Sequence, residues 1–323
     1  MFKQSSIMFL YAETSVHLGG GESLAAIDLA IQRERYTDFP VGASSGIKGA
    51  VRDWFFEDFS KSGKAKPDDR WDEKVKLTFG PENGSASEHA GAASFTDARI
   101  LLFPVKSLKG VFAWITCPMV LQRFKRDLTV AGVGNGWTVP AVSPGNVLGS
   151  AKNQNRTNGN KVVLEEFTFD FTSEDSLSRI AEWLKTNAMP NGEEYKFWKD
   201  NLHTHLLLIT DDDFKDFVKH STEVQARVKL NKRKTTSGDG GNLFYQENLP
   251  TESLMYSLVF TQDVLGQKVN NWGSENDVMD FLKQLNDKRI QIGGNESIGK
   301  GIMCVHFYCP SDATPQRQKE ESK

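Results

Sequence analysis

Both ends of the chain carry short apolar runs of the kind that form buried strands. Residues 5–16 contain the run Ile7–Tyr11, and residues 298–309 contain Ile302–Val305. Runs this short, bounded by glycine and polar residues, favour strands over helices. We therefore predict a strand at each end and expect the two strands to meet in one sheet.

Helical spacing of apolar residues appears first over residues 46–60. Ile47, Val51, Phe55 and Phe59 recur there at intervals of four, which predicts an amphipathic helix with Ser44 or Ser45 as its N-cap. By the same criteria we predict further helices over 119–130, 177–187, 193–201, 211–219 and 278–285, and strands over 100–105, 162–171 and 206–210.

Three polar stretches interrupt this pattern and are predicted to be insertions. Residues 132–160 are rich in Gly, Asn and Pro, which is typical of a long loop. A further stretch, 224–262, resembles a hairpin or arm that turns at Ser237–Gly241 and returns as a strand over Leu254–Thr261. We predict one domain over 1–309 with insertions at about 61–98, 132–160 and 224–250, followed by a polar, disordered tail at 310–323.

The order of these elements predicts the fold class. Strand, helix, strand and then strand, helix, strand, with inserted segments, suit an α+β fold. The expected core is ferredoxin-like (RRM-like), in which helices pack on one face of a sheet. The arm is expected to be a thumb-like β-hairpin outside that core.

Composition adds few constraints. The chain has 323 residues, a formal charge of −3 and a pI near 6.1, so it is not a uniformly basic nucleic-acid binder. The charge is uneven, however, because Arg227–Lys234 is strongly basic while Asp211–Asp213 is acidic. A locally basic surface of this kind can still follow RNA phosphates.

The cysteine spacings and the N-terminal sequence carry no specific signal. The three cysteines lack the paired spacings of a disulfide framework or a zinc site. The N-terminus lacks the pattern of a signal peptide, and no stretch approaches the roughly 20 apolar residues that span a bilayer. We expect a cytoplasmic protein without membrane partners.

Two glycine-rich segments are candidates for phosphate binding. Gly293–Gly301 contains four glycines and Lys300, and glycine permits positive φ and close approach of backbone N–H groups to an anion. The alternative is a tight hairpin turn, and the segment lacks the Gly-Lys-Ser/Thr ending of a nucleotide-binding loop. Near the other chain end, His17 precedes Gly19–Gly21. Lys48 follows in the first turn of a predicted helix, where a bound anion would offset its unfavourable position.

Individual residues leave more than one interpretation open. Asp28 lies between apolar neighbours, and the pattern by itself favours an exposed carboxylate on a short helix capped by Ser23. His17 is a possible general acid or base. The basic arm has Phe244 and Tyr245 nearby, and such mixtures of cations and aromatic rings suit single-stranded nucleic acid, although a solvated hairpin would look the same.

Six separated blocks, in order, resemble one family. They are 17–48, 89–99, 102–113, 164–167, 243–250 and 293–301. Together they resemble the backbone subunit of the Cmr-type (type III-B) CRISPR interference complex, a member of the RAMP superfamily, over roughly residues 5–307. The family's pattern usually has a proline near His17, where this chain has Ser15, Val16 and Leu18.

The resemblance implies an endoribonuclease that acts within an assembled complex. It implies that Asp28 cleaves target RNA, and that the thumb-like arm wedges into the guide–target duplex at regular intervals. RNA supplies its own nucleophile, the 2′-hydroxyl, so one carboxylate can suffice as a proton acceptor or as a ligand of a divalent metal ion, Mg²⁺ or Mn²⁺.

The expected RNA contacts and partners follow from the residue patterns together with the family resemblance. The RNA-binding candidates are Ser45, Lys48, Arg52, Arg33, Gly293, Gly294, Lys300, Arg233, Lys234 and Tyr245, with His17 and Glu247 as secondary candidates. Expected partners are guide CRISPR RNA, complementary single-stranded target RNA, copies of the chain in a helical stack, and other Cmr subunits. Two alternatives remain, namely a non-catalytic guide-binding subunit and a guide-maturing RAMP endoribonuclease that uses His17.

Overall fold

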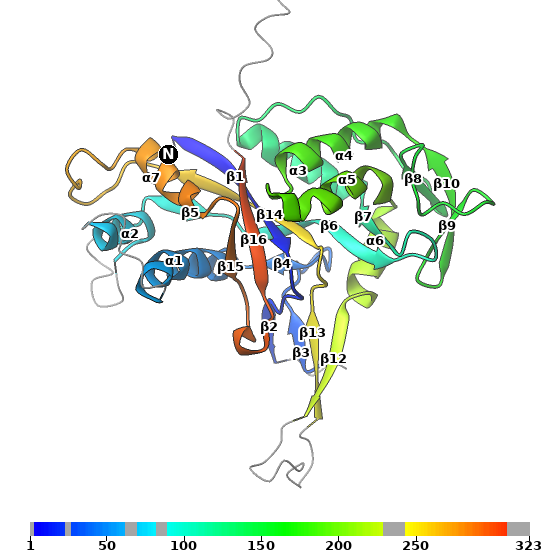
Figure 1. The fold of residues 1–323 in the computed structure, drawn as a ribbon, viewed down its shortest axis with the longest axis horizontal. Coiled ribbons are helices and arrows are strands. Elements are labelled where there is room, and N and C mark those ends of the chain that lie inside the picture. Colours follow the sequence, from blue (N-terminus) through cyan, green and yellow to red (C-terminus); the bar gives the residue numbers. More distant parts are fainter. Residues whose placement is uncertain (1–2, 23–26, 62–69, 82–88, 229–242, 309–323) are drawn as a thin grey trace, which may run out of the picture.

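The chain folds as a mixed α+β protein around one large sheet (Figure 1). The computed structural model describes residues 3–22, 27–61, 70–81, 89–228 and 243–308. The sheet is centred on β16 (Ile302–Tyr308), β1 (Gln4–Ala12), β14 (Leu254–Thr261) and β6 (Ala98–Lys106), adjacent in that order and antiparallel at each step. The predicted pairing of the two terminal strands is thus confirmed, with Ile7 opposite Tyr308.

The sheet extends beyond this centre on both sides. β15 (Lys288–Gln291) lies outside β16, while short β4 (Val41–Gly42) pairs with β6 and β5 (Ala93–Phe95) pairs with β14. Past β6 the order continues through β7 (Phe112–Thr116), β11 (Leu206–Leu208), β8 (Asn146–Gly149), β10 (Phe167–Ser173) and β9 (Lys161–Leu164).

The helices form two groups on either side of the central strands (Figure 1). One group contains α1 (Ser44–Lys61), α2 (Trp71–Phe79) and α7 (Glu275–Leu282), followed by the short 3-10 turn Lys283–Leu285. Phe55 of α1 stacks on Phe281 of α7 at 4.6 Å between ring centroids. The other group contains α3 (Pro118–Val130), α4 (Asp175–Asn187), α5 (Lys196–His205, after the 3-10 turn Glu193–Tyr195) and α6 (Asp211–His220).

A second, smaller sheet projects from the main one (Figure 1). Its order is β12 (Glu223–Val228), β13 (Leu243–Asn248), β3 (Leu29–Ile31) and β2 (Gly19–Glu22). β12 and β13 form a hairpin in which Gln225 lies opposite Gln246, and β3 joins it through Leu29 and Gln246. This sheet brings the glycine-rich N-terminal segment against the basic arm.

Several predicted elements appear close to their expected positions. The helix predicted over 46–60 is α1, and those predicted over 119–130, 177–187 and 211–219 are α3, α4 and α6. The strand predicted over 100–105 is β6. Each of the three stretches predicted as insertions contains regular elements, since α2 and β5 lie within 61–98, β8 lies within 132–160, and strands β12 and β13 fall at 224–250. The predicted tail, 310–323, lies outside the described residues.

Other predictions are corrected. The segment after Asp28 is the strand β3, because β2 and β13 flank it and supply strand partners that a short helix could not use. α1 begins at Ser44, so neither Ser44 nor Ser45 is its N-cap, and Ser44 N–H instead donates to Asp97 Oδ1 at 2.8 Å.

Two strand assignments also change. The strand predicted over 162–171 is a hairpin, β9 and β10, because Glu165 has φ +48° and the chain reverses between Leu164 and Phe167. The strand that returns along the arm is β13, whereas β14 belongs to the centre of the main sheet, where its apolar residues are buried between β1 and β6. None of the described helices has the length and apolar character needed to cross a membrane.

Candidate nucleic-acid interface

Asp28 lies at the base of the β12–β13 hairpin. It immediately precedes β3, its side chain is exposed, and its Oδ2 accepts a hydrogen bond from the backbone N–H of Tyr245 at 2.7 Å. The bond uses one carboxylate oxygen and holds the residue against the arm. Asp28 and Tyr245, predicted from distant parts of the sequence, are therefore brought together.

A buried carboxylate, Glu247, organises the residues behind Asp28. Its side chain is only 3% exposed; Oε2 accepts from Ile31 N–H at 3.0 Å, and Oε1 accepts from Thr222 Oγ1 at 2.8 Å and from the Arg33 guanidinium. Arg33 also donates to Asp38 O at 2.8 Å, and its side chain is 17% exposed. Two sequence candidates, Arg33 and Glu247, thus pair with each other and fasten β3 to the hairpin.

His17 connects three segments of the chain. It is 8% exposed, and its Nδ1 is 2.7 Å from Glu247 O. Its own carbonyl accepts from Gly294 N–H at 3.0 Å. The structure therefore places His17 in the framework that holds the glycine-rich loop against the arm, with little surface available to a substrate.

The loop Gly293–Gly301 packs on the N-terminal segment. Gly293 has φ +84°, and a Cβ there would lie 2.3 Å from His17 O, so close approach of two backbones requires this glycine. Backbone N–H groups within the loop donate to protein carbonyls at Gly294, Gly299, Lys300 and Gly301. These four groups are occupied within the chain.

The charged residues of the loop region are also engaged. Lys300 Nζ donates to Ser15 Oγ and lies 4.0 Å from Glu223 Oε2. Arg227 of β12 donates to Asn295 Oδ1 at 2.7 Å and lies over the Phe244 ring at 5.6 Å. The loop and the arm base therefore form one connected unit.

The first turns of α1 present an open surface. Ser45, Gly46 and Gly49 are exposed, and a Cβ added at either glycine would meet nothing within 4 Å. Burial, together with the neighbouring charge of Arg52, lowers the pKa of Lys48, whose Nζ donates to Ala93 O at 3.2 Å. An anion at this surface would counter this effect by favouring the charged form of Lys48.

A depression of about 380 Å³ lies over β2, β3 and Val41 of β4. Gln32, a residue that no sequence motif singled out, spans it: its Nε2 donates to Gly19 O at 2.8 Å, and its Oε1 accepts from Ala43 N–H at 2.8 Å just before α1. The depression is lined by Gly20, Gly21, Ala30, Ile31, Gln32, Arg33 and Val41.

The remaining candidates are distributed unevenly. Tyr245 is 41% exposed on β13, and its backbone N–H is the group that bonds Asp28. Arg52 lies over the Phe56 ring at 5.4 Å, on the same helix as Lys48. Arg233 and Lys234 lie outside the described residues. Within the part of the chain that the structure describes, no group of three or more His, Cys, Asp and Glu side chains is arranged to hold a metal ion.

Comparison with known proteins gives the superfamily to which the chain belongs and then the family within it. The family model described as the RAMP superfamily matches residues 9–304. Among curated proteins, the chain is 37% identical over 300 residues to the CRISPR system Cmr endoribonuclease Cmr4 of Pyrococcus furiosus, covering 92% of this chain and 93% of that protein. The chain belongs to the RAMP superfamily and, within it, to the Cmr4 family.

Solved structures agree. The crystal structure of oligomeric Cmr4 from Pyrococcus furiosus superposes with a TM-score of 0.68 at 31% identity, covering 94% of this chain and 97% of that one. A chain of a type III-B Cmr-beta complex bound to cognate target RNA has a TM-score of 0.69 at 17% identity, covering 95% and 98%, and so shares the fold.

Proposed function

We propose that the chain is a repeating backbone subunit of a CRISPR RNA-guided complex, which holds guide RNA and cleaves complementary target RNA through Asp28. The observation that carries the proposal is the exposed Asp28 carboxylate, held by Tyr245 N–H at the base of a projecting hairpin. The relative at 37% identity is named an endoribonuclease, and a solved relative is described as oligomeric, which supports both halves of the proposal.

Guide RNA is proposed to lie along α1 and the adjoining depression. Ser45, Lys48 and Arg52 supply a hydroxyl and two cations, and the exposed Gly46 and Gly49 allow a phosphate backbone to come close. The adjoining depression is lined by β3, which follows Asp28, and by Gln32, which bonds Ala43 N–H just before α1. Because these contacts are to the phosphate backbone of the RNA, the target sequence would be read by base pairing between guide and target rather than by the protein.

The cleavage chemistry needs few protein groups. The target 2′-hydroxyl would attack the adjacent phosphorus, forming the O2′–P bond and breaking the P–O5′ bond, which leaves a 2′,3′-cyclic phosphate and a 5′-hydroxyl. Asp28 would accept the 2′-hydroxyl proton, and a proton from solvent would go to the leaving oxygen. Tyr245 N–H bonds Oδ2 and so orients the carboxylate.

A divalent ion fits this arrangement only if RNA supplies further ligands beside the Asp28 carboxylate. Mg²⁺ commonly binds through one or two carboxylates together with substrate phosphates, and Asp28 can supply one such carboxylate. A bound Mg²⁺ or Mn²⁺ would stabilise the charge that develops on the phosphate.

The architecture suits an assembly subunit. We assign the central strands β16-β1-β14-β6, with α1 between β1 and β6 and α7 between β14 and β16, to a ferredoxin-like core. The β12–β13 hairpin, which projects from this core, is assigned as the thumb that separates guide–target base pairs beside Asp28 of a neighbouring copy. His17 is assigned a positioning role, because its ring is buried and bonded to Glu247 O.

The test is cleavage of a labelled RNA complementary to the bound guide, in the assembled complex with Mg²⁺. Asp28→Asn keeps an acceptor for Tyr245 N–H but removes the charge, and we expect at least a hundredfold loss of cleavage with guide and target binding unchanged. Asp200→Asn, at an exposed aspartate on α5, is the matched control and should cut as the wild type does. Equal cutting by Asp28→Asn would remove this residue from the mechanism; binding without cutting in the wild type would support the structural alternative.

A further inference from the structure

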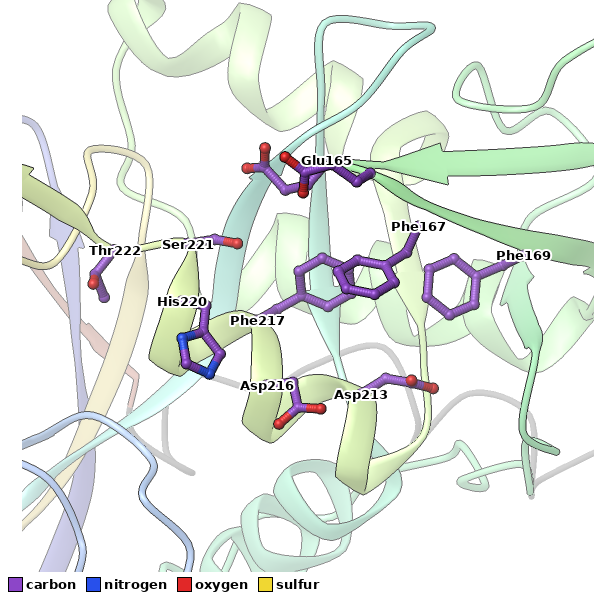
Figure 2. Close-up of a pocket in the computed structure, with 10 residues that line it drawn as sticks. Glu165, Phe167, Phe169, Asp213, Asp216, Phe217, His220, Ser221 and Thr222 are labelled. Atoms are coloured by element: carbon purple, nitrogen blue, oxygen red, sulfur yellow. The ribbon is translucent and has the colours of Figure 1, made fainter.

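A groove with an aromatic floor and acidic walls lies between the β9–β10 turn and α6. Figure 2 shows three phenyl rings gathered between Glu165 on one side and Asp213 and Asp216 of α6 on the other. The groove encloses about 540 Å³. Aromatic rings and carboxylates therefore line one cavity.

The rings of the floor are open to the groove. Phe167, the first residue of β10, is 59% exposed and meets the Phe217 ring edge-on, with 5.8 Å between the centroids. The Phe169 ring lies 6.2 Å from the same Phe217 ring. The faces of aromatic rings attract cations and also pack against methylene groups. An open set of rings in an acidic cavity therefore favours a ligand with both positive charge and apolar parts.

The carboxylates around these rings lack cationic partners. The side chains of Glu165, Glu166 and Asp216 form no hydrogen bond or ion pair with any residue that the structure describes. Carboxylates gathered in this way create a negative potential, which attracts cations and repels phosphate groups. The groove is therefore suited to a ligand with several positive charges and is unsuited to RNA.

A second depression continues from the groove and shares Glu165 and Ser221 with it. It encloses about 390 Å³, and its wall includes Phe112 and Trp198, whose ring centroids are 6.1 Å apart. Glu252 also lines it, and Glu252 Oε2 is buried and accepts no hydrogen bond from a described residue. A buried carboxylate oxygen without a donor is costly. This oxygen therefore indicates that a ligand with an N–H donor can bind in the second depression.

The lining of the two depressions favours a small organic cation over a metal ion. Five carboxylates line them, whereas Lys106 and His220 are the basic side chains among the described residues there. Within the described part of the chain, no group of three or more His, Cys, Asp and Glu side chains is arranged to hold a metal ion. Aromatic rings also supply no oxygen ligand for Mg²⁺. Both volumes fall in the range of small-molecule sites, about 300–1,000 Å³.

We propose that the two depressions bind a linear aliphatic polyamine, with its ammonium groups beside Glu165, Asp216 and Glu252 and its methylene chains on the aromatic rings. Ammonium groups form charge-assisted hydrogen bonds with carboxylates, and methylene chains of this kind pack along apolar surface. A bound polyamine supplies the donor that Glu252 lacks and neutralises the groove. The inference goes beyond the proposed function and does not depend on it.

Isothermal titration calorimetry of the RNA-free protein with spermidine tests the site. Glu165→Gln combined with Asp216→Asn removes two charges of the groove and should weaken binding at least tenfold. Phe167→Ala leaves the net charge unchanged and should weaken binding at least threefold, because an exposed ring is lost. Glu182→Gln combined with Glu193→Gln, at exposed positions outside both depressions, is the matched control and should change binding less than twofold.

A series of ligands separates a polyamine site from its alternatives. Affinity should rise from the diamine putrescine to spermidine and then spermine, and equimolar Mg²⁺ should not displace spermidine, because Mg²⁺ gains nothing from the rings. Displacement by equimolar Mg²⁺, or binding that Phe167→Ala leaves unchanged, would overturn the proposal. Equal binding by the groove variant and the matched control would do the same. Tighter binding of an acetylated tetralysine peptide than of spermine would instead assign the groove to a basic segment of another protein and would also overturn it.

Discussion

At the scale of single residues, two carboxylates show how the surroundings of a side chain decide its role. Asp28 is exposed and has one oxygen bonded to Tyr245 N–H, so it can meet a substrate. Glu247 is buried and accepts hydrogen bonds from Arg33, Ile31 and Thr222. Both oxygens of this carboxylate are hydrogen-bonded within the protein. We therefore assign Glu247 a structural role in positioning the site rather than a catalytic one.

Removing the charge of Glu247 should destabilise the fold. Glu247→Gln leaves the partly buried Arg33 without its anion, and we expect a loss of about 2–3 kcal/mol in the free energy of unfolding. Urea denaturation measures it. Asp170→Asn, which breaks an exposed pair with Lys161, is the control and should cost about 0.5 kcal/mol or less. Similar losses of unfolding free energy in the two variants would argue against a structural role for Glu247.

Glu252 predicts a pH dependence of stability. Burial raises its folded-state pKa from the ordinary 4.5 to about 7, so the native state binds the proton more tightly than the unfolded chain does. Its contribution to stability is therefore fully present below pH 4.5 and is lost as the pH rises through 7. Glu252→Gln should match the wild type near pH 4.5 and be more stable by about 1–2 kcal/mol at pH 8, allowing for partial exposure. A difference that is independent of pH would contradict this environment.

Single-residue roles were only partly predictable from the sequence. Asp28 and Tyr245 are exposed and Lys48 is partly buried, and their roles in binding and cleaving RNA stay predictions. Gln32 and Asp97 have no local signal, because each acts on a backbone N–H group that only the tertiary fold brings near: Ala43 for Gln32 and Ser44 for Asp97.

At the scale of elements, the glycine-rich loop is first a packing device. Its glycines let the Gly293 region lie directly on the His17 backbone, and Arg227 and Lys300 tie the loop to the arm. A contribution to phosphate binding would come in addition to this packing. The sequence showed the density of glycines but not the segment against which they pack.

Two glycines in this loop make a matched pair for testing that role. Gly293→Ala places a Cβ 2.3 Å from His17 O at φ +84°, and we expect a loss of more than 2 kcal/mol together with weaker RNA binding. Gly299→Ala has a similar φ of +75° but no atom within 4 Å of the new Cβ, so it should cost about 1 kcal/mol. Thermal unfolding and RNA affinity of both variants measure the difference. Equal losses of stability in the two variants would mean that the loop moves to accommodate the new Cβ at residue 293.

Elements with strong local patterns were the predictable ones. The stripe of α1 and the apolar runs of β1 and β16 identified them correctly. β3 was missed because it has three residues and depends on partners from 217 residues away, as the contact of Asp28 with Tyr245 illustrates. The β9–β10 reversal at Glu165 was missed because glutamate is an uncommon residue at positive φ.

At the scale of the whole molecule, the β12–β13 hairpin projects from the body of the protein (Figure 1). Asp28 lies against this hairpin through its bond to Tyr245 N–H. In the proposed head-to-tail stack, every copy presents the same site at a regular distance along a bound RNA. Each copy should therefore contribute its own cut.

Mixed assemblies test this account most directly. Complexes reconstituted from wild-type and Asp28→Asn subunits in increasing proportion are given an end-labelled target RNA, and the initial rate of each cut is measured. The account predicts a ladder of regularly spaced cuts whose rates fall in direct proportion to the fraction of wild-type subunits and vanish in the all-variant assembly, while target binding stays constant. Cuts that persist in the all-variant assembly would contradict it.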